Sequence, residues 1–368
     1  GGIIIDNYAW PMIFDINIPF GILAVVLTYF FVEDSVHHTT KPSIDWTGIL
    51  LLASFVGSLQ YVLERGESKD WFADESIRIF GIITVVTFIG FIWWELKVKE
   101  PVVNLRLFAS ANLSITTMLT FVSGFALFTS VFVYPLLLQR VLGYTPTMVG
   151  MSLLPSALAS LIVMPIVGRR LQAGDSPKLF ITLAFIIIMI YGWMLAHRTD
   201  INASMDDFFF PLMVRSVGIS MMAVTLTNQA VVGLAPKDIP QGVALNNMMR
   251  QLGGAFGIAI MNTYIAQRAA IHRNDLVSNM VAGSQQFVER NTALMQGIGS
   301  KLAVTGNAQQ QSYQLLDITV TKQAYLLTYM DAFLFSTVAV LAVFPLIALL
   351  RNTKISAEAQ KAASEAAH

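Results

Sequence analysis

Residues 178–196 read KLFITLAFIIIMIYGWMLA, a run in which Lys178 is the single charged side chain. A helix needs about 20 mostly apolar residues to cross the hydrocarbon core of a bilayer, and this run has that length. Similar runs occur along most of the chain. Together they predict nine membrane spans, at 16–34, 46–64, 76–97, 112–138, 147–168, 178–196, 208–235, 243–267 and 325–350.

The composition agrees with a chain that lies largely in lipid. Of the 368 residues, 55% are hydrophobic and 12% are charged, whereas an average soluble domain has about 25% charged residues. The formal net charge is zero, so nothing suggests nucleic acid as a partner. The chain has no Cys, and its five His lack the spacing of motifs such as H-E-x-x-H. We therefore expect an all-α integral membrane protein with no metal site.

Lys and Arg are distributed unevenly between the loops. If 33–45 faces the cytoplasm, the loops on that side hold more of these residues than the short loops on the other side. Because cytoplasmic loops are enriched in positive charge, this predicts a cytoplasmic tail at 353–368. The long segment 269–323 then lies outside. Its loose helical spacing favours a pair of short helices joined by a turn at 306–311.

Polar side chains inside a span are costly, so each one is a candidate functional residue. Arg215 lies within 208–235, where it faces an internal cavity, takes part in helix packing or reaches the lipid headgroups. Asn228 and Gln229 follow about 20 Å farther along the same helix, at another depth. These two either contact substrate or hydrogen-bond to a neighbouring helix.

The span 243–267 contains a second polar group. Asn246 and Arg250 are four residues apart, so they share one face of the helix. Gly253, Gly254 and Gly257 follow, and the Gly253/Gly257 spacing lets another helix pack closely. We expect Arg250 to be a structural or gating residue near the cytoplasmic end.

Asp331 lies near the start of the last span. An acid at that depth pairs with a cation, binds and releases a proton, or faces water at the interface. The residues alone leave these three alternatives open.

The opening stretch GGIIIDNYAWPMIFDINIPFGIL, at 1–23, resembles the end of the fifth helix in major facilitator superfamily drug–proton antiporters. The similarity is greatest to the 14-helix, EmrB/QacA-like branch. In that family the antiporter motif ends in Gly-Gly and is followed by a Trp and by Asn-x-Pro-x-Gly. The matching residues here are Gly1, Gly2, Trp10, Asn17, Pro19 and Gly21. The family has Arg-Trp directly after the Trp, where this sequence has Pro11 and Met12.

Four further stretches resemble the same branch. YPLLLQRVLGYTPTMVGMSLLP, at 134–155, is similar to its seventh core helix and the following loop, and adds Tyr134 and Gln139 as candidate site residues. GRRLQAGDSPK, at 168–178, resembles its second cytoplasmic loop motif. NNMMRQLGGAFGIAI, at 246–260, and KQAYLLTYMDAF, at 322–333, resemble later helices. The resemblance extends to about residue 352.

The resemblance implies a major facilitator fold that is truncated at the N-terminus. Residues 1–34 correspond to the end of the N-terminal helical half, and 35–108 to two extra linker transmembrane helices. Residues 109–352 correspond to the C-terminal six-helix half, with a periplasmic loop at 269–323, and 353–368 to the tail.

It also implies a function. Proteins of this branch are expected to export hydrophobic or amphiphilic drugs across the bacterial inner membrane by alternating access. The energy comes from the proton gradient, so no cofactor is expected. A periplasmic adaptor protein and an outer-membrane channel are expected partners.

Other functions remain open. A proton-coupled symporter and a narrow-substrate exporter would use the same fold. An intramembrane enzyme would need a nucleophile with its base or clustered His, Asp and Glu, and the sequence has no such cluster. A membrane sensor would need a soluble output domain, for which the tail is too short. We therefore do not expect an enzyme.

Overall fold

The computed structural model describes residues 1–9, 11–31, 44–280, 284–301 and 308–350. All regular structure in these ranges is helical, and no strand occurs there. The predicted all-α class is thus confirmed. The tail at 353–368 and Trp10 lie outside the described residues, so the predictions made for them stay untested.

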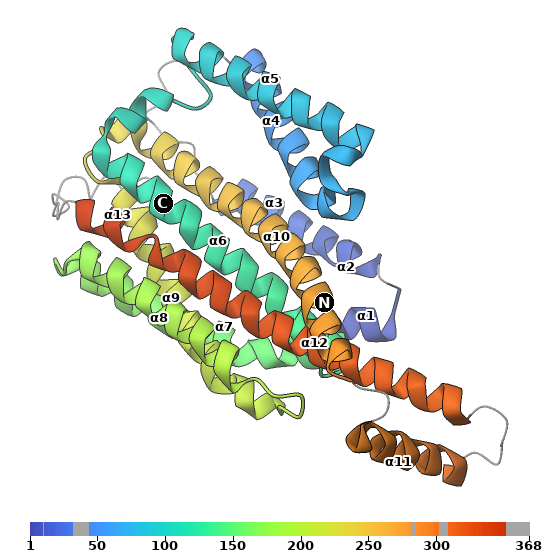
Figure 1. Ribbon diagram of the computed structural model, residues 1–368. Helices are drawn as coiled ribbons and strands as arrows, with labels where there is room; N and C mark the ends of the chain where they lie inside the picture. Colours follow the sequence, from blue (N-terminus) through green and yellow to red (C-terminus); the bar gives the residue numbers. More distant parts are fainter. Residues whose placement is uncertain (10, 32–43, 281–283, 302–307, 351–368) are drawn as a thin grey trace.

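Six long helices lie side by side and form the main bundle (Figure 1). They are α6 (Ala111–Arg140), α7 (Pro146–Gln172), α8 (Pro177–Arg198), α9 (Met205–Val231), α10 (Ile239–Ser278) and α12 (Ala308–Leu341). Large apolar side chains fill the space between them: Tyr134, Phe185, Phe208, Tyr329 and Phe333 are each at most 2% exposed. Many apolar side chains on the outer faces, such as Leu161 and Ile162 of α7, are exposed, as lipid-facing residues are.

Eight helical segments in the described ranges are long and apolar enough to cross a membrane, where the sequence predicts nine. The difference is 243–267, which is helical as part of α10. Its polar residues, Asn246 and Arg250 among them, keep its hydropathy below that of the other spans. α10 nevertheless packs along α6 in the bundle (Figure 1).

Three predicted spans have different boundaries. The first, predicted at 16–34, is helical over α3 (Asn17–Phe31) and is preceded by the short helix α2 (Met12–Asp15), with 32–34 outside the described residues. The span at 208–235 ends at Val231, because Gly233 takes a positive φ of 81° and turns the chain. The last span is broken into α12 and α13 (Phe344–Leu349), and Pro345 lies in the first turn of α13, where its missing N–H costs nothing.

The outer segment 269–323 differs from the predicted pair of short helices. α10 runs on to Ser278, α12 begins at Ala308, and a separate helix, α11 (Gln285–Lys301), packs against α12 beyond the end of the bundle (Figure 1). Residues 302–307 are outside the described ranges. The turn predicted at 306–311 is wrong for 308–311, which form the first turn of α12.

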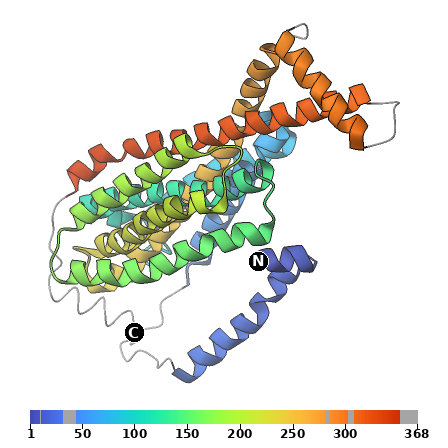
Figure 2. The ribbon, with the colours of Figure 1, turned by 90° about the horizontal axis from the view of Figure 1, so that it is seen from below.

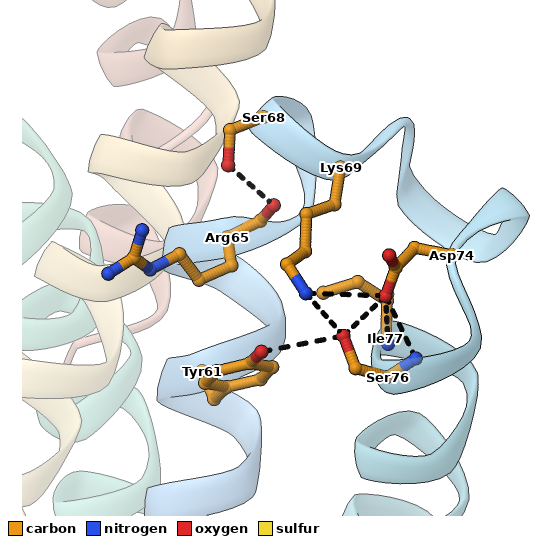
Figure 3. A network of polar contacts seen from close by, with 7 residues as sticks. All are labelled: Tyr61, Arg65, Ser68, Lys69, Asp74, Ser76 and Ile77. Atoms are coloured by element: carbon orange, nitrogen blue, oxygen red, sulfur yellow. Dashed lines mark hydrogen bonds and ion pairs between the residues drawn. The ribbon is translucent and has the colours of Figure 1, made fainter.

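The helices α4 (Trp46–Arg65) and α5 (Glu75–Lys97) form a hairpin beside α10. Polar contacts hold its turn, which contains the short helices η1 (Glu67–Lys69) and η2 (Trp71–Ala73) (Figure 3). Asp74 is the N-cap of α5. Its carboxylate accepts the backbone N–H of Ser76 at 2.8 Å and that of Ile77 at 3.3 Å. Lys69 Nζ donates to Ser76 Oγ at 2.7 Å and completes the network.

The N-terminal helix α1 (Gly2–Asn7) packs against the start of α7 (Figure 2). A Cβ on Gly2 would lie 2.3 Å from the carbonyl oxygen of Pro146, so only glycine allows this approach. Asp6 Oδ2 accepts the backbone N–H of Thr147 at 2.9 Å. This carboxylate therefore satisfies a free donor at the N-terminus of α7.

Candidate functional site

Arg215 is buried in the middle of the bundle, with 7% of its surface exposed. It lies on α9 and points at α6 and α8, where its Nη1 donates to Ser130 Oγ at 3.1 Å. Ser130 in turn donates to the hydroxyl of Tyr191 at 3.1 Å. The guanidinium carbon lies 6.0 Å from the centre of the Tyr191 ring, within range of a cation–π contact.

This position excludes one of the alternatives for Arg215 and leaves a cavity role and a packing role open. The side chain faces the interior of the helix bundle and does not reach the lipid headgroups. Within the described ranges it forms no ion pair, and its Nε has no hydrogen-bond partner. The guanidinium contacts one hydroxyl and one aromatic ring, so its Nε–H remains free to donate to an anion or to another hydrogen-bond acceptor.

The polar residues at the far end of α9 behave differently from one another. Gln229 is 1% exposed, and its Nε2 donates to Asn112 Oδ1 on α6 at 2.8 Å. In the other direction, Nδ2 of Asn112 donates to the backbone carbonyl of Gln229 at 3.0 Å. These reciprocal bonds fit the helix-packing alternative for Gln229. Asn228 is half-buried on the adjacent face and has no such contact to α6.

A second polar group lies where α6 and α10 cross. Thr120 Oγ1 donates to Asn246 Oδ1 at 2.6 Å, and both side chains are buried. Arg250 is half-buried, and its Nη2 donates to Asn247 Oδ1 at 2.6 Å. A small pocket between α6, α9 and α10 is lined by these groups together with other hydroxyl and apolar side chains: Thr120, Ser123, Thr227, Asn246, Arg250 and Met222.

The predicted close packing at the glycines is present. A Cβ on Gly253 would lie 1.9 Å from the carbonyl oxygen of Phe121, and one on Gly257 would lie 3.0 Å from that of Phe125. A Cβ on Gly254 would meet the ring of Phe128 at 2.4 Å. All three therefore let α10 approach the backbone of α6.

Asp331 on α12 lies at the centre of a third group. Its Oδ2 accepts Nε of Arg268 at 2.7 Å and lies 2.8 Å from Nε2 of His272, both on α10. The carboxylate is 25% exposed, Arg268 36% and His272 18%. Of the three alternatives for Asp331, the structure therefore shows pairing with a cation, Arg268, with the ring of His272 beside the same carboxylate oxygen.

The remaining candidates lie apart from these groups. Tyr134 is fully buried, its hydroxyl lies 2.9 Å from Ser152 Oγ, and its ring packs edge-on against Phe208. Gln139, near the end of α6, is exposed. The motif residues Gly1, Asn17, Pro19 and Gly21 are also exposed. Among the described glycines of the N-terminal motif, Gly2 lies against α7, whereas nothing lies within 4 Å of a Cβ built on Gly1 or Gly21.

Sequence reasoning missed three partners. Arg268 and His272 lie just beyond the predicted span 243–267, and the sequence names neither as a candidate, although α10 continues through both. Tyr191 lies within the predicted span 178–196 and is not a candidate either. No group of His, Asp and Glu arranged to hold a metal is found within the part of the chain that the structure describes.

Comparison with known proteins gives one family. The family model described as Major Facilitator Superfamily matches residues 1–258. Multidrug export protein EmrB of Escherichia coli (strain K12) is 29% identical over 333 residues, which cover 90% of this chain and 63% of that protein. Fatty acid resistance protein FarB of Neisseria gonorrhoeae is 28% identical, over 95% of this chain and 67% of that protein.

A third relative, multidrug export protein EmrB of Haemophilus influenzae, is 31% identical over 280 residues, or 76% of this chain and 55% of that protein. The chain thus spans 63% of the length of the E. coli protein and 55% of that of the H. influenzae protein.

Proposed function

Because the chain belongs to the Major Facilitator Superfamily, we propose that the full-length protein exports hydrophobic or amphiphilic drugs across the bacterial inner membrane in exchange for protons. The family consists of membrane transporters and not enzymes, and this chain is a multi-pass membrane protein. The observation that carries the proposal is the alignment of 90% of the chain with a multidrug export protein. No cofactor is needed, since the proton gradient supplies the energy.

Two features of the bundle support transport over a purely structural role. Arg215 is a buried cation with an unused donor, and a structural core has little reason to retain one. The small pocket beside Arg250 places polar side chains at a helix crossing within the membrane region. Intramembrane polar groups of this kind commonly mark substrate or ion pathways.

Proton coupling is assigned to Asp331. While the carboxylate is ionised, it holds Arg268 and His272 and so joins α12 to α10. A proton on Asp331 removes the negative charge and weakens this connection. The two helices can then shift relative to one another, and such rocking of helices about a central site is how transporters of this kind alternate access.

The experiment is dye efflux from energised cells that express the full-length reading frame, with and without a proton uncoupler. Ethidium serves as the cationic probe and anilinonaphthalene sulfonate as the anionic probe, because Arg215 favours anions. Uncoupler-sensitive loss of either dye supports drug–proton antiport. Identical handling of both dyes with and without the protein contradicts multidrug export and favours a narrow-substrate exporter.

A proton-coupled symporter on the same fold is the rival. The two differ in the direction of dye movement under an imposed proton gradient. A symporter would accumulate the dye in energised cells, whereas an antiporter would deplete it.

We also propose a contact with a periplasmic adaptor and, through it, an outer-membrane channel. The supporting observation is that α11 packs against α12 and lies beyond the bundle (Figure 1). Replacing 285–301 by a short Gly/Ser linker should abolish drug resistance of whole cells. Dye transport by the same variant in membrane vesicles should persist. Equal resistance with and without this segment contradicts the adaptor contact.

A further inference from the structure

The small pocket between α6, α9 and α10 lies where the backbones of α6 and α10 are in close contact. A Cβ on Gly124 would overlap the carbonyl oxygen of Arg250, so the backbone of α10 at Arg250 lies directly against that of α6 at Gly124. Ser123, the residue before Gly124, and Arg250 both line the pocket. The close contact of the two helices thus holds a hydroxyl and a cation around the same space.

The other polar groups at the pocket offer mainly hydrogen-bond donors. Asn246 is 1% exposed, and its Oδ1 already accepts the hydroxyl of Thr120 at 2.6 Å. This bond leaves the amide N–H groups of Asn246 available to an occupant. Arg250 uses Nη2 for its bond to Asn247, and a guanidinium has five N–H donors, so most of them remain. Neither a guanidinium nor an amide nitrogen accepts a hydrogen bond.

The hydroxyl of Ser123 has no hydrogen-bond partner within the part of the chain that the structure describes, although the residue is only 7% exposed. Other buried hydroxyls of α6 bond to the backbone carbonyl four residues earlier, as Thr116 does at 2.7 Å and Thr117 at 2.9 Å. A buried hydroxyl left unpaired is costly. Because Ser123 lines the pocket, its unpartnered hydroxyl points to a ligand there.

The positive charge at the pocket is not balanced by its lining helices. α6 has no acidic residue, α9 has Asp206 and Asp207 in its first turn, and α10 has none before Asp275. Ile219, the pocket residue of α9 closest to that turn, follows Asp207 by 12 residues, or about 18 Å of helix. Arg250 forms no ion pair with any described residue. The pocket therefore favours an anion.

The size of the pocket restricts that anion. Its volume of about 20 Å³ is enough for roughly one particle of the size of a water molecule. A monatomic anion fits, whereas sulfate or the acid group of a drug with its attached carbon chain does not. The rest of the lining is apolar, which lowers the local dielectric constant and strengthens the attraction between an anion and Arg250. These apolar residues include Leu127, Ile219, Met222 and Leu226.

We propose that this pocket binds one chloride ion. The guanidinium of Arg250, the amide N–H of Asn246 and the hydroxyl of Ser123 donate to it. The ion balances the charge of Arg250 and connects α6 to α10, so it stabilises the crossing of the two helices. The site goes beyond the proposed export function and does not rest on it, because its test measures ion binding and stability, not transport.

The first test is the melting temperature of the purified full-length protein in lipid nanodiscs, in sodium chloride and in sodium gluconate of equal ionic strength. An ion that binds the folded state raises the melting temperature, and gluconate is too large for the pocket. The wild-type protein should therefore melt at a higher temperature in chloride, and bromide should replace chloride.

Variants assign this effect to the pocket. Ser123→Ala should raise the chloride concentration that gives half of the shift by about tenfold, because a hydrogen bond to an ion is lost. Arg250→Met should remove the shift. Thr117→Ala is the matched control, since it deletes a buried hydroxyl of the same helix that bonds to its own backbone and does not line the pocket. It should keep the chloride dependence of the wild type, including any general effect of the salt.

The second test is anomalous X-ray scattering from crystals of the full-length protein grown in bromide. A bromide peak should lie beside Arg250 and Ser123. Equal melting temperatures of the wild type in both salts, with no bromide peak in the pocket, would show that water occupies it and would overturn the proposal. A chloride effect that is as large in Ser123→Ala as in Thr117→Ala would place the ion elsewhere and would also overturn it. If Arg250→Met does not fold, Ser123→Ala and the bromide peak decide.

Discussion

Nε of Arg268 donates to Oδ2 of Asp331 at 2.7 Å, and this bond joins α10 to α12 near the outer end of the bundle. The same carboxylate oxygen lies 2.8 Å from His272. Beyond this point both helices continue towards α11 (Figure 1). The group therefore lies between the membrane-embedded part of the bundle and its outer extension.

Asp331→Asn should lower uncoupler-sensitive dye efflux by at least about tenfold. A rise of about 1.4 kcal/mol in the activation free energy of the rate-determining step has that effect. The amide cannot carry the charge that holds Arg268, and it cannot exchange a proton. Initial efflux rates in energised cells measure this. Asp317→Asn is the matched control, since Asp317 pairs with Arg273 at 2.6 Å on the same two helices but is 57% exposed. Equal efflux in the two variants would contradict a coupling role for Asp331.

Arg215→Met should abolish dye efflux without lowering thermal stability. Methionine has similar length but no charge, and removing a buried cation without an ionic partner is often neutral or stabilising. Intrinsic Trp fluorescence during heating gives the melting temperature of the purified protein, and vesicle transport gives the activity. A lower melting temperature with full transport would instead make Arg215 a structural residue.

Gly253→Ala should destabilise the fold by about 1–3 kcal/mol, the usual cost of forcing an extra methyl group into a packed interior. The new Cβ would lie 1.9 Å from the carbonyl oxygen of Phe121, so α10 must move away from α6. Gly168→Ala is the control, because nothing lies within 4 Å of a Cβ there. Thermal unfolding should separate the two variants, and equal melting temperatures would show that the helices do not meet at Gly253.

The turn of the α4–α5 hairpin should loosen in acid. The hydroxyl of Ser76, then burial and backbone N–H groups, set the pKa of Asp74, and the net effect holds it below its ordinary value of 3.8. The ionised carboxylate therefore contributes stability above that ordinary value, and this contribution is lost as the pH falls through the lower pKa of the folded state.

Amide exchange at Ser76 and Ile77 measures this, because both N–H groups bond to Asp74. Protection should be constant from pH 7 to about 5 and fall below about pH 4. Asp74→Asn should show the same protection at every pH after correction for intrinsic exchange. A wild-type profile that is equally flat in acid would show that Asp74 does not stabilise the turn.

Most of the fold could be predicted from the sequence, because the lipid environment imposes long apolar runs that are easy to recognise. α8, for example, differs from its predicted span by only a few residues. The failures have a common cause. In α10, Asn246 and Arg250 face neighbouring helices and not lipid, so hydropathy alone underestimates a span that is shielded by its partners. In the outer segment 269–323 the apolar periodicity is weak. The sequence therefore predicts short separate helices there, where the structure has long extensions of α10 and α12.

The candidate sites were predictable one residue at a time but not as groups. Arg215 and Asp331 stand out because a charge within an apolar run is costly. Their partners do not, since Tyr191 lies 24 positions before Arg215 and Arg268 lies 63 before Asp331. Only the packing of α8 on α9 and of α10 on α12 brings them together.

The most direct test is simultaneous measurement of dye and proton movement in proteoliposomes that contain the full-length protein, under an imposed pH gradient. If the protein is a drug–proton antiporter, adding dye to the vesicles should accelerate proton flux in the opposite direction, and Asp331→Asn should abolish both movements together. Proton flux that does not respond to either the cationic or the anionic dye, or that runs in the same direction as the dye, would contradict proton-driven export.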